Sequence, residues 1–137
     1  METIVSTSTS NELHVIFGTG PLGKWTAREL VRMGKCVRLI NRSGTAKGLP
    51  AEAEVVEGNA YDVTSNIALT KGAAAVYQCA QPPYNQWPDN FSRMQAALLE
   101  AAAANGAKFI AAENLYLYGD PGGQPLRSQA LLDGLHP

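Results

Sequence analysis

Residues 13–43 have the sequence LHVIFGTGPLGKWTARELVRMGKCVRLINRS, which contains the strongest structural signal in the chain. An apolar run comes first, followed by a glycine-rich turn, an amphipathic segment and a second apolar run. Apolar runs of this kind are typical of strands that are buried on both faces of a parallel sheet. We therefore predict a strand from Leu13 to Phe17, a helix from Pro21 to Met33 and a strand from Cys36 to Ile40.

The turn after the first predicted strand has the pattern G-x-G-x-x-G, formed by Gly18-Thr19-Gly20-Pro21-Leu22-Gly23. The first glycine permits a tight turn, the second lets a pyrophosphate approach backbone N–H groups, and the third lets the helix pack closely on the strand. The helix N-terminus then offers unpaired N–H groups to the phosphates. An ordinary strand–helix turn could also contain these glycines, but their position between a strand and a helix favours dinucleotide binding.

The second predicted strand ends in Asn41-Arg42-Ser43, which bears on the choice of nucleotide. In NAD-binding folds of this kind, an acidic residue at this place usually binds the ribose 2′-hydroxyl. Arg42 can instead hold a 2′-phosphate bidentately, with Asn41 and Ser43 as hydrogen-bonding neighbours. We therefore predict NADP rather than NAD as the cofactor. The alternative is that Arg42 is only a solvated loop charge.

The rest of the chain continues the alternation of strands and helices. Further strands are predicted over Glu54–Glu57, Ala73–Ala80 and Lys108–Ala112. Helices are predicted over Ser65–Lys71 and from Trp87 or Asp89 to Ala104. This alternation predicts an α/β fold, a doubly wound, Rossmann-like parallel sheet of five strands in the order 3-2-1-4-5.

The predicted domain organisation is simple. Residues 1–11 are predicted to be a flexible leader, because they are rich in Ser and Thr, and residues 12–137 to be the nucleotide-binding domain. In the last predicted helix, the buried face would be formed by Phe91, Met94, Leu98 and Ala101.

Composition limits the classes of function. With 45% hydrophobic and 17% charged residues, the chain fits a globular protein with buried strands. A net charge of −1 suggests neither nucleic acid nor membrane as a partner. Cys36 and Cys79 lie in apolar runs and are predicted to be buried free thiols of a reducing cytoplasm, with too few ligands for a metal site. No signal peptide and no span of about 20 apolar residues is recognised, so we expect a cytoplasmic protein.

Taken together, the motifs resemble the N-terminal, nucleotide-binding part of an extended or atypical short-chain dehydrogenase/reductase, the superfamily of nucleotide-sugar epimerases and dehydratases. The resemblance covers about residues 13–125. It rests on GTGPLG after the first strand, NRS after the second, VVEGNAYD at the third, VYQCAQPP at the fourth and KFIAAENLYLYG at the fifth.

The resemblance implies further site residues. Asn59 and Ala60 would border the adenine, and Cys79, Ala80 and Gln81 would border the ribose on the nicotinamide side. A hydride would pass between the nicotinamide and a small carbonyl, hydroxyl or nucleotide-sugar-like substrate. The residues that would lie near this substrate are Gln81, Glu113 and either Tyr116 or Tyr118.

Two departures from the family pattern concern catalysis. Members use a Tyr-x-x-x-Lys pair, in which the lysine lowers the pKa of the tyrosine so that it can act as acid and base. No tyrosine of this sequence has a lysine four residues later. The position of the catalytic Ser or Thr falls near Ala112 or Glu113, and neither is a hydroxyl. Glu113 could polarise a substrate or a water, or it could be a solvated loop acid.

The C-terminal strands and the substrate-binding segment of the family are also missing from the sequence, so the fifth strand would be a bare sheet edge. We therefore expect a truncated product, a fragment, or a subunit whose edge is covered by a second copy or a partner chain. Three functional hypotheses remain open: an oxidoreductase or epimerase/dehydratase, a non-catalytic NADP-binding sensor, and a folded remnant that binds nothing.

Overall fold

The computed structural model describes residues 11–113 and 120–125. Each strand and helix predicted above is present, with its ends within two residues of the prediction. The elements in chain order are β1 (Leu13–Phe17), α1 (Pro21–Arg32), β2 (Cys36–Asn41), β3 (Glu54–Glu57), α2 (Val63–Leu69), β4 (Ala73–Gln78), the 3-10 helix η1 (Tyr84–Gln86), α3 (Trp87–Ala104) and β5 (Lys108–Ala111).

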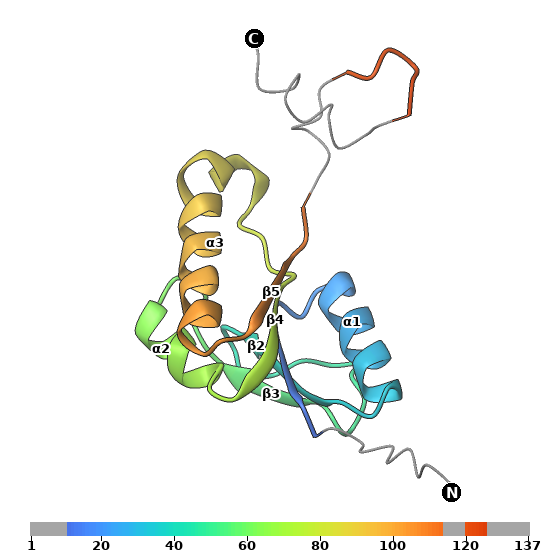
Figure 1. Ribbon diagram of the computed structural model, residues 1–137, viewed down its shortest axis with the longest axis vertical. Coiled ribbons are helices and arrows are strands. Elements are labelled where there is room, and N and C mark those ends of the chain that lie inside the picture. The colour runs from blue at the N-terminus through green and yellow to red at the C-terminus, as the bar shows by residue number, and fades with distance from the viewer. Residues whose placement is uncertain (1–10, 114–119, 126–137) are drawn as a thin grey trace, which may run out of the picture.

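The five strands form one parallel sheet in the order β3-β2-β1-β4-β5. Figure 1 shows α1 on one face of the sheet and α2 and α3 on the other. The prediction of a doubly wound Rossmann-like sheet is confirmed. Since the chain runs outward from β1 in one direction and from β4 in the other, the strand order reverses between these two strands. Ligands of open parallel sheets bind at this point, beyond the carboxyl ends of the strands.

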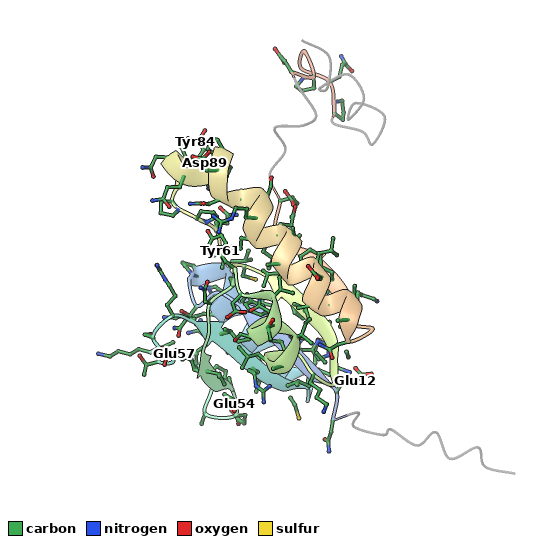
Figure 2. All side chains as sticks on the ribbon, turned by 90° about the vertical axis from the view of Figure 1, so that its left-hand side faces the viewer. Glu12, Glu54, Glu57, Tyr61, Tyr84 and Asp89 are labelled. Atoms are coloured by element: carbon green, nitrogen blue, oxygen red, sulfur yellow. The ribbon has the colours of Figure 1, made fainter. Side chains whose placement is uncertain are left out.

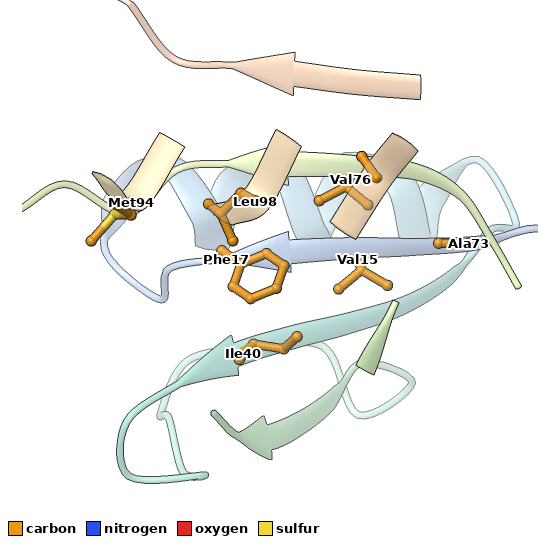
Figure 3. Close-up of a cluster of buried hydrophobic side chains, with 8 residues drawn as sticks. Val15, Phe17, Ile40, Ala73, Val76, Met94 and Leu98 are labelled. Atoms are coloured by element: carbon orange, nitrogen blue, oxygen red, sulfur yellow. The ribbon is translucent and has the colours of Figure 1, made fainter. Parts of the chain in front are cut away.

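Each face of the sheet has its own hydrophobic cluster. The cluster under α3, drawn in Figure 3, joins side chains of β1, β2, β4 and α3, namely Val15, Phe17, Ile40, Ala73, Val76, Met94, Leu98 and Ala102. The cluster under α1 contains Ile16, Ala27, Leu30, Val37 and Leu39. Central strands that contribute to both clusters explain the continuous apolar runs in the sequence.

The chain reverses by short, glycine-containing connections. Gly34 follows α1 with φ of 76°, and the Lys35 N–H donates to the Leu30 carbonyl, which closes the helix.

At the end of β4, the N–H groups of Cys79 and Ala80 both donate to the Phe17 carbonyl. Because two N–H groups share this one carbonyl, the regular hydrogen-bond pattern between β1 and β4 ends here. Strand β4 therefore ends at Gln78, two residues before the predicted end at Ala80.

Two predictions about burial were wrong, and a third was met only in part, because Cys79 is half-buried. Cys36 is exposed, because it is the first residue of β2 at the rim of the sheet, where no helix covers it. Phe91 is half-buried and is not among the buried residues of α3. It lies in the first turns of α3, which extend beyond the strand ends, so its ring packs against Trp87 rather than against the sheet. Among the helices of the described residues, none is long and apolar enough to span a lipid bilayer.

Candidate functional site

A cavity of about 410 Å³ lies at the carboxyl ends of β1, β2, β3 and β4, and the first turns of α3 close one side. It occupies the point at which the strand order reverses. Seven residues that the sequence predicts for cofactor binding line it: Gly18, Asn41, Arg42, Asn59, Ala60, Ala80 and Gln81.

Within the glycine motif, Gly18 and Gly23 are required by packing. Gly18 has φ of 116°, and a Cβ atom there would lie 2.6 Å from the Ala80 nitrogen. A Cβ atom on Gly23 would overlap the carbonyl oxygen of Gly18. These two glycines therefore bring β1, α1 and the end of β4 into close contact.

Gly20 differs, because its backbone faces open space. A Cβ atom there would meet no atom within 4 Å, and φ of −73° is accessible to any residue. Gly20 is also the N-cap of the twelve-residue helix α1, and no side chain caps this helix. The first turn of a helix has N–H groups without partners inside the helix, so an uncapped start beside open space at Gly20 is compatible with a phosphate site. Of the six motif residues only Gly18 lines the cavity, and the others, Thr19, Gly20, Pro21, Leu22 and Gly23, do not.

Asn41 holds the two loops beside the cavity together. Its Nδ2 group donates to Thr19 Oγ1 at 3.0 Å and to the Thr45 carbonyl at 2.7 Å, and its Oδ1 accepts from the Gly44 N–H at 2.7 Å. Ser43 Oγ donates to the same Thr45 carbonyl at 3.1 Å. The side-chain amide of Asn41 is therefore already hydrogen-bonded within the protein. Its contribution to a ligand site is to hold the two loops in place.

Arg42 is exposed, and its guanidinium group makes no hydrogen bond or ion pair with any other residue that the structure describes. It lines the cavity and also a shallower depression of about 580 Å³ beside it. Glu57, at the end of β3, lines this depression as well. An unpaired guanidinium is thus present where an acid would stand in an NAD-specific fold.

The residues predicted at the end of β4 lie on opposite faces of the sheet. Ala80 and Gln81 line the cavity, whereas the Cys79 side chain packs in the cluster under α1. Burial raises the pKa of the Cys79 thiol, and a hydrogen bond with Thr26 opposes this shift. Burial likewise raises the pKa of Tyr77, two residues earlier. Both groups are therefore neutral at physiological pH.

Of the predicted catalytic residues the structure describes only Glu113, and it does not line this cavity. Glu113 lies at the end of β5 and lines a second hollow, formed by Tyr84, Trp87, Pro88 and Phe91. Tyr116 and Tyr118 lie outside the described residues.

Four polar residues of the cavity wall were not predicted from the sequence, namely Tyr61, Gln86, Asn90 and Arg93. The guanidinium of Arg93 lies 5.2 Å from the centre of the Tyr61 ring, so the β3–α2 connection contacts α3 here. Asn90, Arg93 and Met94 follow each other at helical spacing, on the face of α3 that also supplies the core. Asn90 precedes the buried Met94 by one helical turn, so extending the predicted buried face toward the helix start would have found it, whereas no sequence signal marks Arg93, which is exposed.

No protein-family model matches the chain, and no curated protein matches it. Solved structures do. Uronate dehydrogenase from Agrobacterium tumefaciens is 20% identical with a TM-score of 0.64, over 90% of this chain and 52% of that one. A variant of it has been solved with NAD.

Two epimerases are also similar in structure. UDP-N-acetylglucosamine 4-epimerase from Bacillus cereus is 18% identical with a TM-score of 0.70, over 86% of this chain and 40% of that one. UDP-glucose 4-epimerase from Thermotoga maritima is 19% identical with a TM-score of 0.66, over 78% of this chain and 40% of that one. The chain therefore spans about half or less of each protein. Its fold is the Rossmann fold of these dehydrogenases and epimerases, in agreement with the resemblance in its motifs.

Proposed function

We propose that the chain binds NADP(H) in the 410 Å³ cavity, as the nucleotide-binding part of an oxidoreductase or epimerase/dehydratase of the short-chain dehydrogenase type. The observation that carries this proposal is the unpaired guanidinium of Arg42 at the cavity. A 2′-phosphate would satisfy it with charge-assisted hydrogen bonds, whereas NAD has no group of matching charge at that position.

The other residues take roles that follow from their positions. The open face of Gly20 and the uncapped start of α1 would receive the pyrophosphate. Asn59 and Ala60 would border the adenine. Ala80 and Gln81, at the end of β4, would border the ribose on the nicotinamide side, and the backbone of Cys79 precedes them.

The chemistry would take place beyond the end of β4. Bound NADP(H) would accept or supply a hydride for a small carbonyl or hydroxyl compound or a nucleotide-sugar-like substrate. Among the described residues, Glu113 is the candidate that would polarise this substrate, and Tyr116 and Tyr118 remain predictions. The chain spans about half or less of the proteins it resembles, and that it catalyses this reaction without a further chain segment is also a proposal.

Calorimetric titration of the 137-residue chain with NADPH and with NADH tests the nucleotide site. We expect tighter binding of NADPH. Arg42→Gln should weaken NADPH binding about tenfold, which corresponds to the loss of one charge-assisted contact, and leave NADH binding unchanged. Lys47→Gln removes an exposed cation from the same loop but outside the cavity, and serves as the control. Equal binding of both nucleotides, or equal effects of the two variants, would refute the role of Arg42.

A non-catalytic NADP sensor is the second candidate. A sensor needs only the nucleotide site, and Glu113, the one described candidate for catalysis, does not line that cavity. Oxidation of NADPH with a panel of carbonyl compounds separates the two functions. A rate that scales with the amount of protein and is lost in Gly20→Trp would exclude the sensor. Binding without any such rate would favour it.

A further inference from the structure

A second hollow lies beside the nucleotide cavity and has a different chemistry. Tyr84, Trp87, Pro88, Phe91 and Glu113 line it, and its volume is about 440 Å³. We call it the aromatic cup. The segment from Pro82 to Trp87 contributes to both sites, because Pro82, Pro83 and Gln86 line the nucleotide cavity while Tyr84 and Trp87 line the cup.

The three rings of the cup are held at fixed, tilted angles. The Trp87 ring centre lies 4.9 Å from that of Tyr84 and 5.3 Å from that of Phe91, with interplanar angles of 57° and 53°. The Trp87 indole N–H donates to the Pro82 carbonyl at 3.0 Å, which fixes the indole and uses its only donor. The rings are not stacked face to face, and Tyr84 is 71% exposed where it lines the hollow, so part of the aromatic surface is open to a ligand. Aromatic faces carry negative partial charge.

The charge of the cup is also negative. Glu113 is the only charged residue that lines it, and its Oε1 accepts a hydrogen bond from the neutral Gln95 amide. No lysine or arginine in the part of the chain that the structure describes forms an ion pair with Glu113. Asp89, labelled in Figure 2, lies in the first turn of α3 and offsets the positive end of the helix dipole.

We propose that the aromatic cup binds an organic cation, specifically an alkylated ammonium group. Three aromatic rings with one carboxylate form the arrangement that recognises such cations, because the ring faces and the carboxylate attract positive charge while the alkyl groups need no hydrogen bonds. A sugar ring fits less well. Its many hydroxyl groups need donors and acceptors, and with the indole N–H already used, the cup offers only Glu113 and the Tyr84 hydroxyl.

The cup thereby adds a substrate class to the proposed function, and this assignment of its role rests on that function. If NADP occupies the cavity, the shared segment from Pro82 to Trp87 would bring a cationic substrate group next to the nucleotide. The binding of a cation by the cup can be measured independently of any nucleotide.

Choline is a suitable probe, and 3,3-dimethyl-1-butanol is its neutral analogue of the same shape. The sequence has two tryptophans, so Trp25→Phe leaves Trp87 as the only indole, whose fluorescence reports on the cup. In this background, we expect choline to change the Trp87 emission saturably, and the neutral analogue to bind about tenfold more weakly or not at all. Glu113→Gln should weaken choline binding about tenfold, whereas Glu100→Gln, which removes an exposed carboxylate of α3 outside the cup, should leave it unchanged.

Three outcomes would overturn the proposal. The first is no binding of choline in the millimolar range. The second is equal binding of the neutral analogue without any effect of Glu113→Gln, which would identify a merely apolar pocket. The third is equal loss in the Glu113 and Glu100 variants, which would identify non-specific attraction. A parallel NADPH titration separates this proposal from the nucleotide site, because Glu113→Gln should leave NADPH affinity unchanged and either site can fail while the other binds.

Discussion

Gln78 places an amide group in an apolar interior. Its side chain is 1% exposed, and neither its Oε1 nor its Nε2 atom has a hydrogen-bond partner among the described residues. A buried polar group without partners costs about 1–3 kcal/mol, and methionine has nearly the same shape without that cost. We therefore expect Gln78→Met to raise the free energy of unfolding by about 1–3 kcal/mol in urea denaturation. A decrease would mean that the amide has a partner in the protein.

The two cysteines should differ in reactivity. The Cys79 thiol has a pKa raised by burial, so at a given pH a smaller fraction of it is the reactive thiolate, whereas Cys36 is exposed. In the native protein at pH 8, we expect iodoacetamide to label Cys36 rapidly and Cys79 slowly, and mass spectrometry of the digest to show this. Both thiols should react at similar rates in denaturant. Rapid native labelling that survives Cys36→Ser would contradict the expectation.

Glu57 should weaken the binding of NADPH that we propose. Its carboxylate lines the same depression as Arg42, where a 2′-phosphate would lie, and it repels negative charge. Because the group is exposed, the repulsion is worth only about 0.2–1 kcal/mol, so Glu57→Gln should tighten NADPH binding about 1.5- to 5-fold. Calorimetry with NADH provides the control, since NADH lacks the 2′-phosphate and its affinity should not change. Weaker NADPH binding in this variant would show that Glu57 supports the site.

At the scale of elements, the β1–α1 turn contains one glycine that stability requires, Gly18, and one that we expect nucleotide binding to require, Gly20. Gly18→Ala should strongly destabilise the protein, because it combines a positive φ with overlap at Ala80, and such strained or overpacked sites cost about 1–3 kcal/mol each. Gly20→Ala meets no atom of the protein, so stability should be nearly unchanged. Its methyl group would, however, occupy the approach of the pyrophosphate, and NADPH binding should fall about tenfold or more. Thermal unfolding and calorimetry of the two variants measure both effects, and unimpaired NADPH binding by Gly20→Ala would place the phosphates elsewhere.

The sequence predicted the elements well because local signals mark them. The central strands are apolar runs, the short β3 has two valines between glutamates, and glycines such as Gly34 close the helices, so five strands and three helices were found with small errors at their ends. The errors have physical causes that lie outside each segment. Cys36 lies in an apolar run but at an uncovered rim, and Phe91 continues the periodicity of α3 beyond the end of the sheet. Whether such a residue is buried depends on which other element packs against it, and the periodicity of one segment carries no information about its neighbours.

The site was predicted in part, for a related reason. Motif positions such as Gly18 and Arg42 line the cavity because the motif itself describes strand ends. Arg93 enters the wall only because α3 crosses over the β3–α2 connection, and the separation of Glu113 from the cavity depends on where α3 begins. These are properties of packing between elements, and no short stretch of sequence encodes them.

At the scale of the whole molecule, β5 is an edge strand, and among the described residues no strand pairs with its outer side. The Ala112 N–H donates inward to the Gln78 carbonyl, so the alternation along a parallel strand directs the Ala111 N–H outward. We propose that a second copy or a partner chain covers this edge. For self-association, sedimentation analysis should show a concentration-dependent dimer that Ala111→Pro weakens, since proline removes the outward donor and leaves the inward bond. A monomer at all concentrations would exclude the second copy.

The all-parallel sheet has a consequence for how fast the molecule forms. No two neighbouring strands are joined by a hairpin, and the central pair β1 and β4 brings residues 13–17 beside residues 73–78. During synthesis, β1 therefore emerges long before its neighbour β4 exists. The entropy cost of closing such a long loop must be met before the contacts between the two strands form. Folding should therefore take milliseconds to seconds rather than microseconds. Until β4 has been synthesised, α1, β2 and β3 are the only elements that can cover the apolar residues of β1, and exposed apolar surface of this kind favours aggregation of the nascent chain.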